Sequence, residues 1–235
     1  MFKPITPGYL DSLETVLKKA AGVHRQVKLT IDFSKKDKPH AFYLIQGGCI
    51  TNAFISIELA RRGYQNLVFQ LTRFIRESMA LMEYFETLPE NSPILRDWFE
   101  DKIISAPMAP KYPPKKPDPK IEERLKRKAE LSGQSLETVR RVEQVTRMLY
   151  DEFSKSQHVT LKAVKYNVYR DTHEFDYLSK ALQYRGYENF TLGEFIVIPT
   201  IQCLILFPEV TPVSLESRKL LRKLIDDVHN RDMSL

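Results

Sequence analysis

The stretch Arg61–Leu67, RRGYQNL, decides the fold because its sequence pattern is typical of a tight corner between two helices. Gly63 suits the left-handed residue just past a helix end, since glycine has no Cβ to clash. Asn66 is a good N-cap for the helix that follows. We expect Tyr64 to fold back onto the last turn of the first helix, whose C-terminal arginines suit the negative end of its dipole.

The same sequence pattern occurs again in Tyr184–Phe190, YRGYENF. Arg62 and Arg185 lie 123 residues apart, and the same offset separates the two SLETV stretches that begin at Ser12 and Ser135. Two interpretations stay open. Either the chain contains an ancient duplication of a helical unit, or the two halves are similar because helix ends commonly use the same residue types.

Composition indicates a soluble globular protein. The chain has 235 residues, of which 43% are hydrophobic and 28% charged, and these are ordinary proportions. Its most apolar run, Phe195–Phe207, is too short to span a bilayer and predicts a buried core helix. No signal peptide is evident, and Cys49 and Cys203 lie in apolar surroundings. We therefore expect a cytoplasmic protein without membrane contact, whose thiols stay reduced.

Helix signals dominate the rest of the chain, and we predict an all-α helical bundle of about six to seven helices. The third helix should bury one broad apolar face, which includes Leu67, Leu71, Phe74, Ile75 and Met82. Alternating residues leave room for a minor β-hairpin near residues 159–178. The expected helices are Pro7 to Val27, Pro39 to Arg62, Asn66 to Leu88, a short one with Trp98, Lys120 to Leu131 before Gly133, Ser135 to Gln157, a core helix with a Thr191–Glu194 capping box, and one capped by Ser214.

Six prolines between Ser105 and Lys120 forbid a helix there and predict an extended connector at residues 105–119. This connector separates N-terminal helices at 1–104 from C-terminal helices at 120–235. We expect the two parts to pack together as one domain.

The net charge of +6 is concentrated between Lys111 and Arg147, where eleven basic residues face six acidic ones. Such clustering is typical of nucleic-acid binding, and Lys126, Arg127 and Lys128 are the candidate contacts to RNA. The alternative is an ordinary solvated helix, because the segment mixes both signs of charge.

Two groups of residues could carry chemistry. Arg73 and Glu77 lie one helical turn apart and can pair. Arg147, Asp151, Ser154 and His158 share one stripe of a predicted helix, and such a group could transfer a proton or bind phosphate. The single histidine of Arg170–Asp176, RDTHEFD, matches no zinc spacing, so we expect no metal and no cofactor.

Three motifs in order resemble a group of uncharacterised bacterial helical-bundle proteins. They are LTRFIRESMALMEYF with Arg73 and Glu77, LRDWFEDKII with Trp98, and LYDEFSKSQH with Tyr150, Ser154 and His158. That group is distantly similar to the HEPN superfamily, many of whose members are RNases or abortive-infection factors. The resemblance covers residues 66–158. It departs from the HEPN catalytic pattern, because no arginine lies four to six residues before His158.

The resemblance and the residues together lead us to expect a binding protein with an RNA or protein partner, in a stress or phage-defence setting. One alternative is a metal-independent RNase in which His158 transfers protons and Arg147 steadies phosphate. Either Ser154 or Asp151 would then orient the imidazole. Another is a plain interaction or dimerisation module, which would form a homodimer. Tyr150, Arg73 and Glu77 are candidate binding residues in each case.

Overall fold

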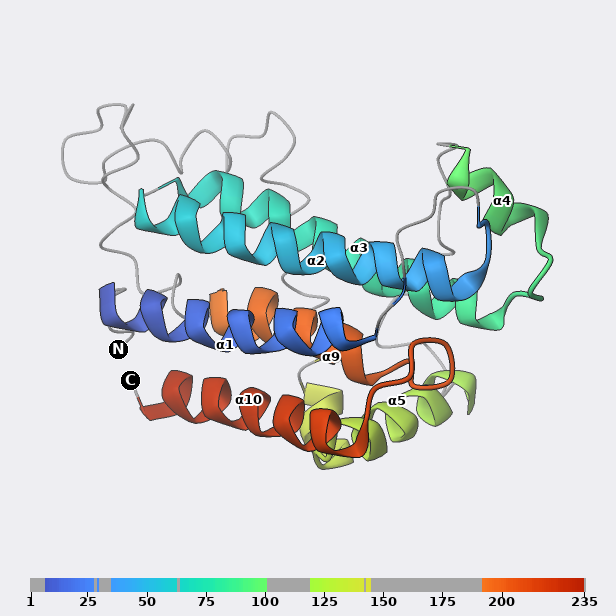
Figure 1. The fold of residues 1–235 in the computed structure, drawn as a ribbon. Coiled ribbons are helices and arrows are strands. Elements are labelled where there is room, and N and C mark those ends of the chain that lie inside the picture. Colours follow the sequence, from blue (N-terminus) through green and yellow to red (C-terminus); the bar gives the residue numbers. More distant parts are fainter. Residues whose placement is uncertain are drawn as a thin grey trace, which may run out of the picture.

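The computed structural model describes residues 7–27, 29, 35–62, 64–100, 119–141, 143–144 and 192–234. Within these ranges all regular structure is helical, so the predicted all-α class is confirmed (Figure 1). The predicted β-hairpin and residues 105–118 of the predicted connector fall outside the described residues. Pro119, the last residue of that connector, instead begins a helix. The elements are α1 (Pro7–Gln26), α2 (Lys38–Arg61), α3 (Gln65–Thr87), α4 (Pro93–Phe99), α5 (Pro119–Ser132), η2 (Gly193–Val197), α9 (Ile198–Ile205) and α10 (Leu215–Ser234); residues 136–141 and 143–144 are helical too.

Helices α1, α2, α3, α9 and α10 form the main bundle of the molecule, in which α3 lies behind α2 and α9 lies behind α1 (Figure 1). The first turn of α1 and the last turns of α10 lie at the same end, while α5 lies beyond the opposite end of α10. One hydrophobic core draws on α1, α2, α3, α4, η2, α9 and α10. A second, small cluster of Leu125, Ala129 and Val139 joins α5 to the helical residues after it. We call this pair of helical segments, residues 119–144, the α5 hairpin.

The corner that the sequence predicts between α2 and α3 is confirmed, with two differences. The amide of Tyr64 donates to the carbonyl of Leu59 at 2.8 Å, which is the six-residue hydrogen bond of a Schellman helix end. Helix α3 begins at Gln65, so Tyr64 is the N-cap residue and Asn66 lies inside the first turn. The prediction that Asn66 caps α3 is therefore wrong. Tyr64 is also exposed, so any contact that it makes with the end of α2 leaves much of its side chain in solvent.

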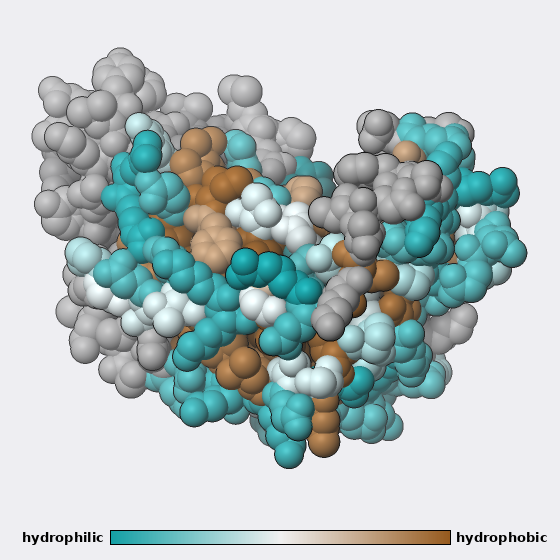
Figure 2. Space-filling model, in the orientation of Figure 1, coloured by the Kyte–Doolittle hydropathy of each residue, from teal (hydrophilic) through white to brown (hydrophobic). Residues whose placement is uncertain are grey.

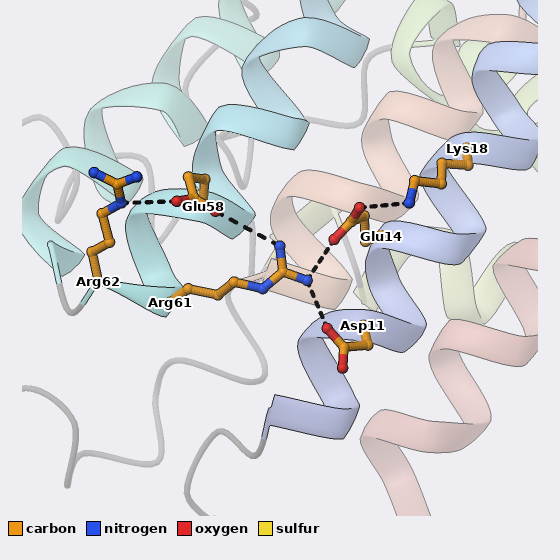
Figure 3. Close-up of polar contacts among 6 residues, drawn as sticks. All are labelled: Asp11, Glu14, Lys18, Glu58, Arg61 and Arg62. Atoms are coloured by element: carbon orange, nitrogen blue, oxygen red, sulfur yellow. Dashed lines mark hydrogen bonds and ion pairs between the residues drawn. The ribbon is translucent and has the colours of Figure 1, made fainter.

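Arg61 at the end of α2 is tied to α1 by ion pairs (Figure 3). Its guanidinium donates to Asp11 at 2.7 Å and to Glu14, whose other oxygen lies 2.7 Å from Lys18. The sequence suggests only that this arginine complements the helix dipole, whereas its nearest partners are carboxylates from another helix. The contact fixes the C-terminal end of α2 against the first turns of α1.

A polar side chain in the core joins α2 to the far end of α9. Gln46 is 1% exposed, and its Nε2 donates to the carbonyl of Cys203 at 2.8 Å and to Oγ1 of Thr211 at 3.0 Å. Carbonyls in the last turn of a helix lack helical donors, so this amide caps α9 from a neighbouring helix. Cys203 and Cys49 are buried free thiols, as predicted, and burial raises the pKa of the Cys203 thiol.

Several helix ends follow the local signals that predict them. Oγ of Ser135 accepts from the amide of Thr138, and Oγ of Ser214 accepts from the amide of Ser217, both at 3.1 Å. Gly133 has φ +73° directly after α5, and Arg222 donates to the carbonyls of Leu131 and Glu130 at the same helix end. These contacts cap α5 from α10.

The predicted core helix is confirmed as buried, but it begins with a π-helical turn, η2. Glu194 in this turn pairs with Nδ1 of His229 on α10 at 2.7 Å, and Thr191, the predicted partner of Glu194 in a capping box, lies outside the described residues. None of the described helices is both long enough and apolar enough to cross a membrane.

Gly133→Ala should destabilise the protein by about 1 kcal/mol, because a Cβ is strained at positive φ. Gly22→Ala is the matched control: Gly22 lies inside α1 and a Cβ there would meet nothing within 4 Å. It should stabilise the protein by about 0.5–1 kcal/mol, since alanine favours helix interiors. Urea denaturation measures both. Equal effects of the two substitutions would contradict the assigned helix end.

Candidate functional site

The candidate catalytic stripe lies outside the described residues. This applies to Arg147, Asp151, Ser154 and His158, and to the candidate binding residue Tyr150. Whether they approach Arg73 and Glu77 is therefore not described, and the RNase hypothesis stays a prediction. In the part of the chain that the structure does describe, no three His, Cys, Asp or Glu side chains gather to hold a metal ion.

Arg73 and Glu77 form the ion pair that their spacing predicts. Nε of Arg73 lies 2.6 Å from Oε1 of Glu77 on the outer side of α3, and half of the Glu77 side chain is exposed. A solvent-exposed pair at this spacing contributes about 0.2–0.5 kcal/mol to helix stability. Within the part of the chain that the structure describes, the pair is a partly exposed contact on α3.

The basic triplet of α5 does not form a uniform basic surface. Lys126 is exposed, but Nη2 of Arg127 lies 2.7 Å from Glu86 and 3.6 Å from Glu209. Lys128 is directed inward and lies 2.5 Å from Glu83. Two of the three candidate RNA contacts are thus paired with carboxylates.

Lys128 belongs to a group of five charged residues between α3 and the α5 hairpin, which we call the charged seam. Glu83 accepts from Arg124 at 2.8 Å and from Lys128, while Glu143 lies 3.3 Å from Arg124 and 3.8 Å from Lys128. Arg76 completes the seam at 3.9 Å from Glu143. Three cations therefore face two carboxylates in a partly buried setting.

The carboxylates that α3 presents to α5 differ in their electrostatics. Burial opposes the ionisation of Glu83, yet Lys128 and Arg124 together hold the pKa of its carboxyl below the ordinary value. Burial has the larger effect on Glu86 and raises the pKa of that carboxyl despite the neighbouring Arg127. Ionised Glu83 thus stabilises the fold, whereas ionised Glu86 costs free energy.

Sequence reasoning missed Arg76, Glu83, Arg124 and Glu143 as site residues. Arg76 and Glu83 lie seven residues apart, and Arg124 and Lys128 lie four apart, so each pair shares one helical stripe. This periodicity is a signal that charged stripes exist on α3 and α5. It does not tell whether the charged stripe of α3 packs against the charged stripe of α5.

A second surface lies on the opposite flank of α3, where this helix packs beside α2. Four large apolar side chains, each more than two-fifths exposed, form what we call the apolar ridge: Ile55, Tyr64, Leu67 and Phe74. Leu67 and Phe74 lie two turns apart on α3, and the ring of Phe74 covers Gly48 of α2 at 3.6 Å from the position of a Cβ. Figure 2 shows hydrophobic surface over α2, toward the end where it meets α3.

The exposed ridge departs from the predicted apolar face of α3. Ile75 and Met82 are buried as expected, whereas Leu67 and Phe74 are exposed. The apolar stripe of α3 is wider than the core can cover, so its edge faces solvent.

Glu83→Gln should destabilise the protein at neutral pH by about 1–3 kcal/mol, because Arg124 and Lys128 lose a charged acceptor in a partly buried site. Glu86→Gln, on the same helix, should cost much less, since the ionised form of Glu86 is already disfavoured. Urea denaturation measures both.

The pH dependence follows from the lowered pKa of Glu83. Its contribution is present above the pKa of the unfolded chain and is lost as pH falls through the folded pKa. The gap between wild type and Glu83→Gln should therefore narrow on acidification. A gap that widens, or a larger cost for Glu86→Gln, would contradict this electrostatic description.

Comparison with known proteins supplies no relative. No family model, no curated protein and no solved structure matches the chain. What bears on function is therefore the arrangement of the residues described above.

Proposed function

We propose that this chain acts by binding a protein partner through the apolar ridge, and that this partner is a second copy of the chain. The observation that carries the proposal is the exposure of four large apolar side chains on two adjacent helices. Scattered exposed hydrophobic residues are ordinary, but a contiguous group is typical of an interaction site. Covering it removes apolar area from water at about 25 cal/mol per Å².

The charges that border the ridge favour a second copy as the partner. On α2, Glu58 lies one turn from Ile55 and pairs with Arg62 at 2.8 Å. On α3, Glu77 lies one turn from Phe74 and pairs with Arg73. Each helix therefore offers both signs of charge beside the apolar residues. A two-fold interface places the same surface against itself and needs this kind of self-complementarity.

The setting of this binding is part of the proposal. Buried free thiols at Cys49 and Cys203 suit a reducing cytosol. A role in stress or phage defence rests on the resemblance of the Arg73–Glu77, Trp98 and Ser154–His158 motifs to HEPN-like proteins, and on nothing else.

RNA is the alternative partner, and the pairing in α5 weighs against it. Binding to RNA draws on cations that can neutralise phosphates. Arg127 and Lys128 are engaged with Glu86 and Glu83, which leaves Lys126 as the exposed cation of the triplet. A protein partner on the ridge requires no such pairs to break.

Light scattering after size-exclusion chromatography tests the proposed function. The wild type should have the molar mass of a dimer at high micromolar concentration. Phe74→Glu should yield a monomer with an unchanged circular dichroism spectrum, because a carboxylate in the centre of an apolar interface is strongly unfavourable.

Leu215→Glu is the matched control, since Leu215 is even more exposed and lies on α10, outside the ridge. It should leave the dimer intact. A wild type that is monomeric at every concentration, or a dimer that Leu215→Glu dissociates as readily as Phe74→Glu, would refute the proposal.

A further inference from the structure

A small cavity lies where the α5 hairpin meets α3 and α9, at the end of the charged seam. Its polar wall consists of Arg76, Lys128, Ser132, Gln134, Glu143 and Gln202. Its volume is about 20 Å³ and it opens to solvent, so it holds about one water-sized atom or group. An oxygen atom of a larger ligand can enter it from the mouth.

The cavity has an excess of positive charge. Arg76 and Lys128 line it directly, and Arg124 approaches Glu143 from the other side. Among the described residues, two carboxylates of the seam, Glu83 and Glu143, face these three cations. This count leaves one positive charge in a setting where each side chain is at most 26% exposed. Such a balance favours a ligand with a single negative charge at this point.

Donors in and beside the cavity are also left without acceptors. The nearest carboxylate oxygen to Arg76 is that of Glu143 at 3.9 Å, beyond hydrogen-bond distance, although the Arg76 side chain is only 17% exposed. Among the described residues, the side-chain amide of Gln202 has no hydrogen-bond partner. Nε of Arg124 is buried without an acceptor. Arg124 does not line the cavity, but the donors of Arg76 and Gln202 do, and an oxyanion can accept hydrogen bonds from both.

We propose that this cavity binds one oxygen of a phosphate group, which lies between Arg76 and Lys128 and accepts from the amide of Gln202. Arginine and lysine are the residues that bind phosphate oxygens by charge-assisted hydrogen bonds. The ammonium of Lys128 has three N–H donors, so it can bind one phosphate oxygen while it stays paired with Glu83, although this pairing leaves it unsuited to the open backbone contacts of an RNA-binding surface. Glu143 shares the same cations and limits the negative charge that the cavity accepts. The phosphate belongs either to free inorganic phosphate or to a phosphodiester.

The site is independent of the proposed dimer. It lies on the flank of α3 that faces α5, whereas the apolar ridge borders α2. Loss of dimerisation in Phe74→Glu should therefore leave phosphate binding unchanged, and each proposal can fail alone.

Isothermal titration calorimetry with inorganic phosphate, at constant ionic strength set by chloride, tests the site. Arg76→Gln should weaken phosphate binding by about tenfold or more, since a charge-assisted hydrogen bond is lost. Glu143→Gln should strengthen binding, because it removes the competing negative charge. Effects of opposite sign cannot arise from a general loss of structure, and Glu143→Gln keeps the test decisive if Arg76→Gln does not fold.

Arg25→Gln is the matched control, because Arg25 is an exposed arginine on α1, outside both the cavity and the apolar ridge, and its Nε donates to the carbonyl of Ala21 at 3.3 Å. It should bind phosphate as the wild type does. Displacement of phosphate by a short single-stranded RNA would identify a phosphodiester as the source, and failure of RNA to displace it would identify free phosphate. No phosphate binding by the wild type, or an equal loss in Arg25→Gln and Arg76→Gln, would overturn the inference.

Discussion

The position of the α5 hairpin depends on the ion pairs that the carboxylate of Glu83 forms with Arg124 and Lys128. The α5 hairpin has a small apolar cluster of its own and adds little to the main core. Its position therefore relies on the charged seam and on Arg222, which caps α5 from α10. The same seam creates the cavity, because three cations share two carboxylates there. Attachment of the hairpin and affinity for an anion thus have one electrostatic origin.

Helix α3 has a different surface on each flank. The flank toward α5 carries Arg76 and Glu83, and the flank toward α2 carries Leu67 and Phe74. The helix can carry two such surfaces because its buried residues, including Ile75 and Met82, already hold it in the core. The two proposals are therefore physically separate, since one rests on apolar area and the other on charge.

Local sequence signals predict the ends of helices well. They fail for features that depend on contacts with a distant part of the chain. Gly133, Ser135 and Ser214 mark helix ends because their effects involve neighbours along the chain. Asn66 misleads because the N-cap of α3 is Tyr64, two residues before the asparagine that the local signal favours. The seam could not be predicted, since Arg124 and Glu83 lie 41 residues apart and meet only through packing. The exposure of the apolar ridge could not be predicted for a related reason. Periodicity gives the width of an apolar stripe, but it does not tell how much of the stripe the core covers.

Native-state hydrogen exchange tests most directly whether the α5 hairpin is held to an apolar bundle mainly by charge. Amides in the middle of α2, next to Gln46, should exchange only through global unfolding, since this helix is buried in the core. Amides of α5 should exchange through a local opening of lower free energy. Added salt should increase the α5 exchange selectively, because it weakens partly exposed ion pairs. Protection of α5 equal to that of α2, and independent of salt, would contradict this account.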